Sequence, residues 1–128
     1  MYLVDTSVWV DFLRGKATEQ VAFLETLLEE GNAFLCEVTY SEICFGARNK
    51  RQLAEYQDHF LEMPFLELPE LWHREVGRMG HRLRKSGYKP FLADLMICLV
   101  AIHHQAGLLT TDRDFIPFEK LFGLKVMN

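Results

Sequence analysis

The chain has 128 residues, 49% of them hydrophobic and 12% aromatic, so it is long and apolar enough to fold around a real core. Its formal net charge of −4 argues against a domain that binds nucleic acid through an overall positive charge. No apolar run approaches the ~18 residues of a membrane helix, and no secretory signal is recognisable. Cys36, Cys44 and Cys98 lie among apolar neighbours without a C-x-x-C pair. We therefore expect reduced thiols in one cytoplasmic domain that spans residues 1–128 and has no membrane segment.

In the first third of the chain, two short apolar runs predict strands because they are β-prone and end at polar residues. They are residues 2–4 and 33–36. The first run ends at Asp5, a residue type that caps helices, and helical spacing continues from there to Gly15. A second helix is predicted between the two strands and ends at Gly31.

A third helix is predicted to open at Val38, directly after the second strand, and to carry Glu42 early in its length. The residues expected to face inward from this segment are Ile43, Phe45 and Ala47. A helix with a polar face follows over residues 51–60, and Pro64 ends it because proline cannot continue a helix.

In the second half of the chain, residues 65–68 predict a third strand and residues 108–111 a fourth, with residues 124–127 as a candidate fifth. A long helix between the third and fourth strands has an inner stripe at positions i, i+4, i+7 and i+11. This stripe consists of Trp72, Val76, Met79 and Leu83. A second helix, from about Leu92 to Gln105, is apolar nearly all round and should be buried on most faces.

Strands that alternate with helices in this way indicate the α/β class, with a central parallel sheet of four or five strands and helices on both faces. In such sheets, functional groups gather beyond the carboxyl ends of the strands. Asp5 and Asp112 each follow a predicted strand, and Glu42 follows another by about a turn and a half. Asp94 lies in the first turn of the helix that leads into the fourth strand. We therefore expect the four acids to converge at one rim of the sheet.

Four segments carry these acids in order along the chain, and together they span most of its length. The segments are Val4–Gly15, Thr39–Ile43 with Gly46 and Arg48, Ala93–Leu95 with Ile97, and Leu109–Phe115. In order and spacing they resemble the motifs of the PIN-domain ribonucleases, and within that family the VapC-type toxins of prokaryotic toxin–antitoxin pairs. The chain departs from many relatives at Cys98–Leu99, where they have two alanines. That difference changes packing and leaves the acids in place.

The resemblance implies a single PIN domain over residues 1–128 with the three-layer PIN-like fold. It also implies a metal-dependent endoribonuclease that hydrolyses RNA phosphodiester bonds, with Mg²⁺ as cofactor and Mn²⁺ as a substitute. The expected partners are the RNA substrate, a cognate VapB-type antitoxin and a second copy of the chain in a homodimer. DNA would be contacted only through the antitoxin.

Carboxylates gathered in one pocket repel one another, and a hard divalent cation with oxygen ligands relieves that repulsion. Mg²⁺ keeps several waters and takes only one or two carboxylates directly. We predict that Asp5, Glu42, Asp94 and Asp112 are the catalytic acids. Asp5 and Asp94 are predicted to bind the metal directly, while Glu42 and Asp112 hold metal-bound waters or a second ion.

Five further residues have expected supporting roles. Thr6 and Ser7 can each donate a hydrogen bond to a ligand carboxylate or to phosphate, or cap the helix that follows Asp5. Asp114 either orients ligands or caps the next turn, and it competes with Asp112 for the place of fourth acid. Arg14 and Arg48 belong to motif segments and are candidates for contact with RNA phosphates.

Two other functions compete with the nuclease. A receiver-like signalling domain is of similar size and binds Mg²⁺ at an acidic cluster, but the third predicted strand here ends at Leu68–Pro69 without an aspartate. A PIN-like adaptor that binds RNA or protein without cutting is the second alternative. The sequence leaves open the RNA that is cut, the number of metal ions, the identity of the antitoxin and the geometry of the oligomer.

Overall fold

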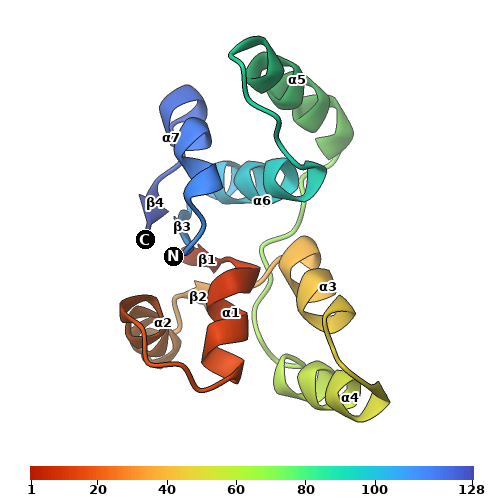
Figure 1. Cartoon of the computed structure of the whole chain (residues 1–128), viewed down its shortest axis with the longest axis vertical. Helices are drawn as coiled ribbons and strands as arrows, with labels where there is room; N and C mark the ends of the chain where they lie inside the picture. Colours follow the sequence, from red (N-terminus) through yellow and green to blue (C-terminus); the bar gives the residue numbers. More distant parts are fainter.

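A parallel sheet of four strands lies between two layers of helices in the computed structural model, which describes residues 1–128 (Figure 1). The strands are β1 (Tyr2–Val4), β2 (Ala33–Phe34), β3 (Gly107–Leu109) and β4 (Val126–Met127). Their order in the sheet is β2-β1-β3-β4. The predicted α/β class and three-layer arrangement are confirmed, and the candidate fifth strand is present as β4.

Two groups of helices cover the two faces of this sheet, with α1 to α4 on one side and α5 to α7 on the other (Figure 1). The helices are α1 (Thr6–Leu13), α2 (Glu19–Glu30), α3 (Glu37–Phe45), α4 (Lys50–His59), α5 (Trp72–Lys85), α6 (Leu92–His103) and α7 (Ile116–Phe122), with a short 3-10 helix, η1 (Arg113–Phe115), before α7. None of them is long and apolar enough to cross a membrane.

The alternation of side chains along the strands divides the core into two parts. Leu3 of β1 and Leu108 of β3 point into the core formed with α5, α6 and α7. The next residues, Val4 and Leu109, point into the core formed with α1, α2 and α3. Because successive side chains of a strand face opposite ways, two central strands of three residues each are enough to anchor both helix layers.

Residues 65–68 do not form the predicted third strand. They contribute one isolated parallel bridge, between Leu35 and Phe65. Farther along, the backbone N–H of Leu68 donates to the Glu37 carboxylate at 3.0 Å instead of to a neighbouring strand. The prolines on both sides of this segment lack the N–H that a longer ladder requires.

The α3 helix differs from its prediction in two respects. Phe45, which was expected to face inward, is 93% exposed, while Ile43 is buried. Two residues along a helix correspond to a rotation of about 200°, so Phe45 must point away from the side that Ile43 buries. Glu42 is the sixth residue of the nine-residue helix, not an early one, which agrees with the expected turn and a half after β2.

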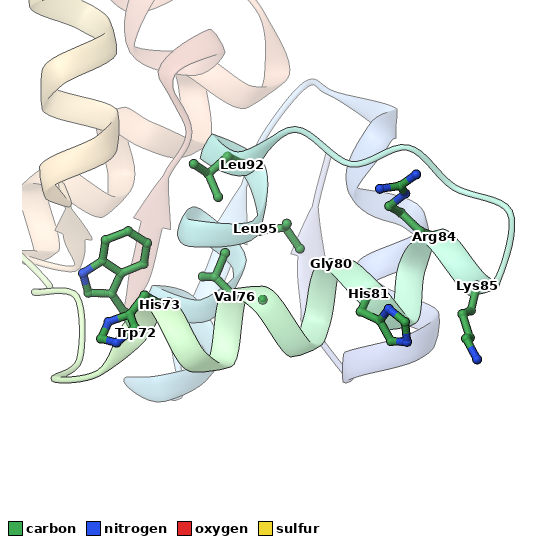
Figure 2. A pocket seen from close by; sticks show the side chains of 10 residues that line it. Trp72, His73, Val76, Gly80, His81, Arg84, Lys85, Leu92 and Leu95 are labelled. Atoms are coloured by element: carbon green, nitrogen blue, oxygen red, sulfur yellow. The ribbon is translucent and has the colours of Figure 1, made fainter.

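The close approach of α5 to α6 depends on a glycine. A Cβ atom added at Gly80 would lie 3.0 Å from Cδ1 of Leu95, whereas a Cβ at Gly77, on the same helix, would meet nothing within 4 Å. Figure 2 shows Gly80 of α5 facing Leu95 of α6. Substitutions at the two glycines can therefore separate the effect of packing on stability from the effect of helix propensity.

Gly77→Ala is expected to raise the free energy of unfolding by about 0.5–1 kcal/mol, because alanine loses less backbone entropy in a helix than glycine. Gly80→Ala is expected to raise the free energy of unfolding by less, since its new methyl group displaces the Leu95 side chain. Urea denaturation of both variants measures the difference. Equal stabilisation by the two substitutions would show that Gly80 does not set the spacing between α5 and α6.

Candidate active site

Asp5 is fixed at the carboxyl end of β1 by three hydrogen bonds. Its side chain is only 6% exposed and caps α1, with Oδ1 accepting from the backbone N–H of Thr6 at 2.9 Å. Oδ2 accepts from the Thr110 hydroxyl at 2.7 Å and from the Ser7 hydroxyl at 3.2 Å. Burial raises the pKa of Asp5 although these hydrogen bonds lower it, and the charge of Glu42 raises it further.

Thr110 links Asp5 to the fourth motif. Its side chain is fully buried just beyond β3, and its hydroxyl donates to Asp5 while accepting from the backbone N–H of Asp112 at 2.9 Å. One hydroxyl therefore connects two segments that are 105 residues apart. Sequence reasoning placed Thr110 in a strand and in the fourth motif segment but gave its hydroxyl no role. A threonine at the end of a buried strand, two residues before an acid, is the signal that could have identified it, because a buried hydroxyl needs partners.

Thr110→Val is expected to lower the free energy of unfolding by about 1–3 kcal/mol, because the buried Asp5 carboxylate loses a donor and the Asp112 N–H loses an acceptor. Thr110→Ser keeps the hydroxyl, so its free energy of unfolding should fall much less. Thr111→Val is the matched control, since Thr111 is exposed. Urea denaturation compares the three variants, and a Thr110→Val loss no larger than that of the control would contradict the bridging role.

Glu42 reaches the same rim from α3. Its side chain is exposed, and Oε1 accepts from the Thr6 hydroxyl at 2.8 Å. Thr6 thus ties α3 to the start of α1 through its side chain, while its backbone N–H binds Asp5. Of the two roles considered for Thr6 and Ser7, the structure places both hydroxyls on carboxylates and gives the capping of α1 to Asp5.

Asp94 lies in the first turn of α6 and is half-buried. Its pKa is raised from 3.8 to about 7, first by burial and then by four negative charges. In decreasing order of effect, those charges belong to Asp5, Asp112, Glu42 and Asp114. All the other acids that the sequence placed at one rim therefore act on the pKa of Asp94.

Asp112 and Asp114 occupy the turn that follows β3. Asp112 is half-buried and caps η1, with Oδ1 accepting from the backbone N–H of Asp114 at 2.9 Å. Asp114 is exposed. The capping role considered for Asp114 thus belongs to Asp112, and Asp112 also has the larger effect on the Asp94 pKa.

None of these five acids forms an ion pair with a basic side chain. The three salt bridges of the chain use other carboxylates, those of Asp11, Glu55 and Glu75. At the same time, no three acidic, imidazole or thiol side chains lie close enough together to hold one ion. The two findings are compatible, because charges interact over longer distances than metal–ligand bonds, and Mg²⁺ takes only one or two carboxylates directly. Unpaired oxygen donors with surplus negative charge fit a hard divalent cation.

Arg14 and Arg48 lie together beside the acids. Both are exposed, and both line a cavity of about 500 Å³ that also contains Glu42. The segments that directly follow α1 and α3 thus bring two arginines to the Glu42 side of the acidic rim. Two cations next to unpaired carboxylates suit a polyanion that reaches the rim from this side.

The chain is similar to known proteins over nearly its whole length. The family model for the PIN domain matches residues 2–121. Ribonuclease VapC19 of Mycobacterium tuberculosis is 30% identical over 117 residues, which cover 91% of this chain and 93% of that protein. Ribonuclease VapC11 of the same species is 25% identical, with 100% of this chain and 98% of that protein covered.

Solved structures share the fold. VapBC2 from Rickettsia felis, bound to a DNA fragment from its promoter, has a chain that superposes with a TM-score of 0.80 at 21% identity, covering 99% of this chain and 97% of that one. FitAcB from Neisseria gonorrhoeae gives a TM-score of 0.79 at 22% identity, covering 100% of this chain and 97% of that one. With the family model matched over residues 2–121, this chain belongs to the PIN domain family.

Proposed function

We propose that this chain is a metal-dependent endoribonuclease that hydrolyses RNA phosphodiester bonds and serves as the toxin of a VapBC-type pair. The observation that carries the proposal is the environment of Asp94, whose pKa is raised to about 7 first by burial and then by carboxylates from three other segments. The ribonuclease names of the VapC relatives support the same activity. A receiver-like domain is set aside by the family match.

The residues present suit Mg²⁺ or Mn²⁺, with Asp5 and Asp94 as direct ligands. When bound, such an ion polarises a scissile phosphate and lowers the pKa of an attacking water. The chain's own contribution is to orient the carboxylates. Thr110 and Ser7 hold Oδ2 of Asp5 through their hydroxyls, and the backbone N–H of Thr6 holds Oδ1. About one of the four acceptor sites of the carboxylate, on Oδ1, is then left for a ligand.

Glu42 and Asp112 complete the proposed catalytic set by holding water rather than metal. Thr6 fixes one oxygen of Glu42, and the N–H of Asp114 fixes one oxygen of Asp112, so each acid keeps a second oxygen for a water molecule. Asp112 is the proposed fourth acid because it is less exposed than Asp114 and raises the Asp94 pKa more. The Asp114 backbone N–H then holds Asp112, and its own carboxylate adds negative charge at the rim.

Arg14 and Arg48 are the proposed contacts for RNA phosphates on the Glu42 side. They share one cavity with Glu42, and neither is used in a salt bridge. Arginine suits this role because its planar guanidinium binds phosphate through two hydrogen bonds. These contacts would position the strand and would not choose its sequence.

The proposed assembly is a homodimer of single PIN domains, each spanning residues 1–128, that binds a VapB-type antitoxin in the cytoplasm and meets DNA only through that antitoxin. The similar folds of VapBC2 and of VapBC-5, a member of the VapBC family of toxin–antitoxin systems, motivate the antitoxin partner. Exposed apolar side chains support the homodimer, above all those of Phe45, Leu61, Phe91 and Leu92. Light scattering on the purified chain should give twice the 15.0 kDa monomer mass.

Incubation of the purified chain with total RNA tests the proposed activity. Cleavage is expected with Mg²⁺ or Mn²⁺, loss of cleavage with EDTA, and recovery when excess Mg²⁺ is restored. RNA binding without metal-dependent turnover would instead identify the adaptor alternative. Cleavage that persists in EDTA would overturn the metal-dependent mechanism.

A further inference from the structure

A second cavity adjoins the acidic rim and shares no lining residue with the cavity of Arg14 and Arg48. It has a volume of about 270 Å³ and is lined in part by Asp94 and Asp114. Tyr88, Lys89 and Arg113 contribute to its other walls. This volume lies just below the range of about 300–1,000 Å³ for small-molecule pockets, so the cavity can hold at most one nucleotide and excludes a duplex.

The two cations of this cavity are free of ion pairs. Lys89 and Arg113 are both exposed, and neither takes part in a salt bridge although Asp94 and Asp114 line the same cavity. A phosphate that enters the cavity therefore meets two cations without first breaking a salt bridge. Unpaired cations of this kind supply the charge-dependent part of nucleic-acid affinity.

Both cations are carried by short segments whose backbone is fixed. The segment before Lys89 leaves α5 through Gly87, which has φ of 91°, and the backbone N–H of Tyr88 donates to the Leu83 carbonyl at 3.0 Å. Arg113 begins η1, and the buried ring of Phe115 anchors that turn in the core. The fold therefore holds the backbone beside Lys89 and at Arg113, and this limits the backbone entropy lost on binding.

Aromatic side chains complete the lining. Tyr88 is 39% exposed and Phe91 is 70% exposed, and both belong to this cavity. Exposed aromatic rings next to cations form the usual combination for binding single-stranded nucleic acid, because bases stack on the rings while phosphates meet the charges. Phe91 is also a candidate dimer contact, so Tyr88 is the ring assigned to base stacking.

We propose that this cavity binds the nucleotide next to the scissile phosphate, with Lys89 and Arg113 on its phosphate and Tyr88 stacked on its base. The inference rests on the proposed ribonuclease function, which places the scissile phosphate beside Asp94. Glu42 of the acidic rim lines the cavity of Arg14 and Arg48, and Asp94 of the same rim lines the cavity of Lys89 and Arg113. A single RNA strand would therefore pass from one cavity to the other across the acids.

Fluorescence anisotropy with a fluorescein-labelled single-stranded RNA of about ten nucleotides and mixed sequence tests the subsite. Binding is measured in EDTA over a series of salt concentrations, so the readout does not depend on cleavage. The variants are Lys89→Ala/Arg113→Ala and Tyr88→Ala. The control Arg74→Ala/Lys85→Ala removes the same charge from exposed positions of α5 outside the cavity.

The Lys89→Ala/Arg113→Ala variant is expected to bind the RNA at least about tenfold more weakly. The slope of log affinity against log salt concentration should become less negative by about 1.4, or about 0.7 per lost phosphate contact. Tyr88→Ala should weaken binding by about tenfold with the salt slope unchanged. The control should stay near the wild-type affinity and slope.

Affinities equal to that of the control would overturn the subsite while the wild type still binds and cuts RNA. A change confined to the oligomer mass, measured by light scattering, would also overturn it and would assign the surface to a second copy of the chain. Failure of the wild type itself to bind or cut RNA would instead refute the ribonuclease function on which the subsite rests.

Discussion

Replacement of Asp94 by asparagine is expected to stabilise the metal-free protein while abolishing its response to metal. The carboxylate of Asp94 is half-buried among four other acids, so its charge opposes folding at neutral pH. Asparagine has nearly the same shape and removes that charge. We expect the free energy of unfolding to rise by about 1 kcal/mol near pH 8, which corresponds to about 4 °C in Tm. This gain is smaller than the full pKa shift implies, because water screens the partly exposed side chain.

The pH dependence of this gain follows from the direction of the pKa shift. The pKa of Asp94 is raised from 3.8 to about 7 in the folded chain, so the folded state holds its proton more tightly than the unfolded state. Below about pH 3.8 both states are protonated, and the group costs no stability. As pH rises toward 7 the wild type loses stability, whereas Asp94→Asn does not titrate. The difference in Tm should therefore shrink as pH falls toward 4.

Divalent metal is expected to reverse this ranking. A ligand that binds only the folded state raises its stability in proportion to the logarithm of ligand concentration. Thermal melts in Mg²⁺ should thus raise the Tm of the wild type and leave Asp94→Asn almost unchanged. Asp58→Asn, an exposed position on α4, is the matched control and should respond as the wild type does. An equal metal response in Asp94→Asn would contradict the ligand role of Asp94.

Asp5→Asn is expected to lower kcat/KM for RNA cleavage by at least about 100-fold, because the loss of a metal ligand removes several kcal/mol of transition-state stabilisation. The fold should survive. The Ser7 and Thr110 hydroxyls that donate to Asp5 can rotate to accept from the new amide group, so the site keeps hydrogen-bond partners. Circular dichroism and a thermal melt establish that the variant is folded.

The same variant should change the titration of Asp94. The charge of Asp5 is the largest of the four that raise the Asp94 pKa, so its removal should move that pKa back toward 3.8. Carboxyl NMR titration of Asp94 in the metal-free wild type and in Asp5→Asn measures the shift. An unchanged Asp94 pKa would show that the two carboxylates do not share one site, and cleavage at the wild-type rate would remove Asp5 from the mechanism.

The convergence of the acids was predictable because it depends on chain topology. Parallel strands place their carboxyl ends at one edge, so Asp5 and Asp112 had to lie near each other once the β1–β3 pairing formed. Asp94 followed because α6 returns to β3 and therefore begins near that edge. The periodicity of α5 and the all-round apolar surface of α6 also predicted which faces would be buried.

A hydrogen bond from Thr6 or Ser7 to a carboxylate was among the expected roles, but which donor orients which acid was beyond sequence reasoning. The Thr110–Asp5 hydrogen bond joins positions 105 residues apart, and no local pattern specifies that distance. The same limit applies to the Thr6–Glu42 hydrogen bond between α1 and α3. Such pairs are set by the register of the sheet and by helix packing, both of which are tertiary properties.

Two local features were misjudged for different reasons. The apolar run at 65–68 has the composition of a strand, but Pro64 and Pro69 limit its pairing to one bridge. In contrast, α7 had usable signals that the sequence analysis did not use. Pro117 lies in its first turn and Gly123 ends it with φ of 71°, a pattern typical of a helix start and stop.

Manganese binding, followed by the loss of the free Mn²⁺ signal in electron paramagnetic resonance, tests most directly whether the acidic rim is a metal site. The wild type and Asp58→Asn are expected to bind Mn²⁺ with the same stoichiometry and affinity. Asp5→Asn and Asp94→Asn are expected to bind at least about tenfold more weakly, since each loses a direct ligand. Wild-type affinity in both variants would contradict the account, because the converging carboxylates would then not be the residues that hold the metal.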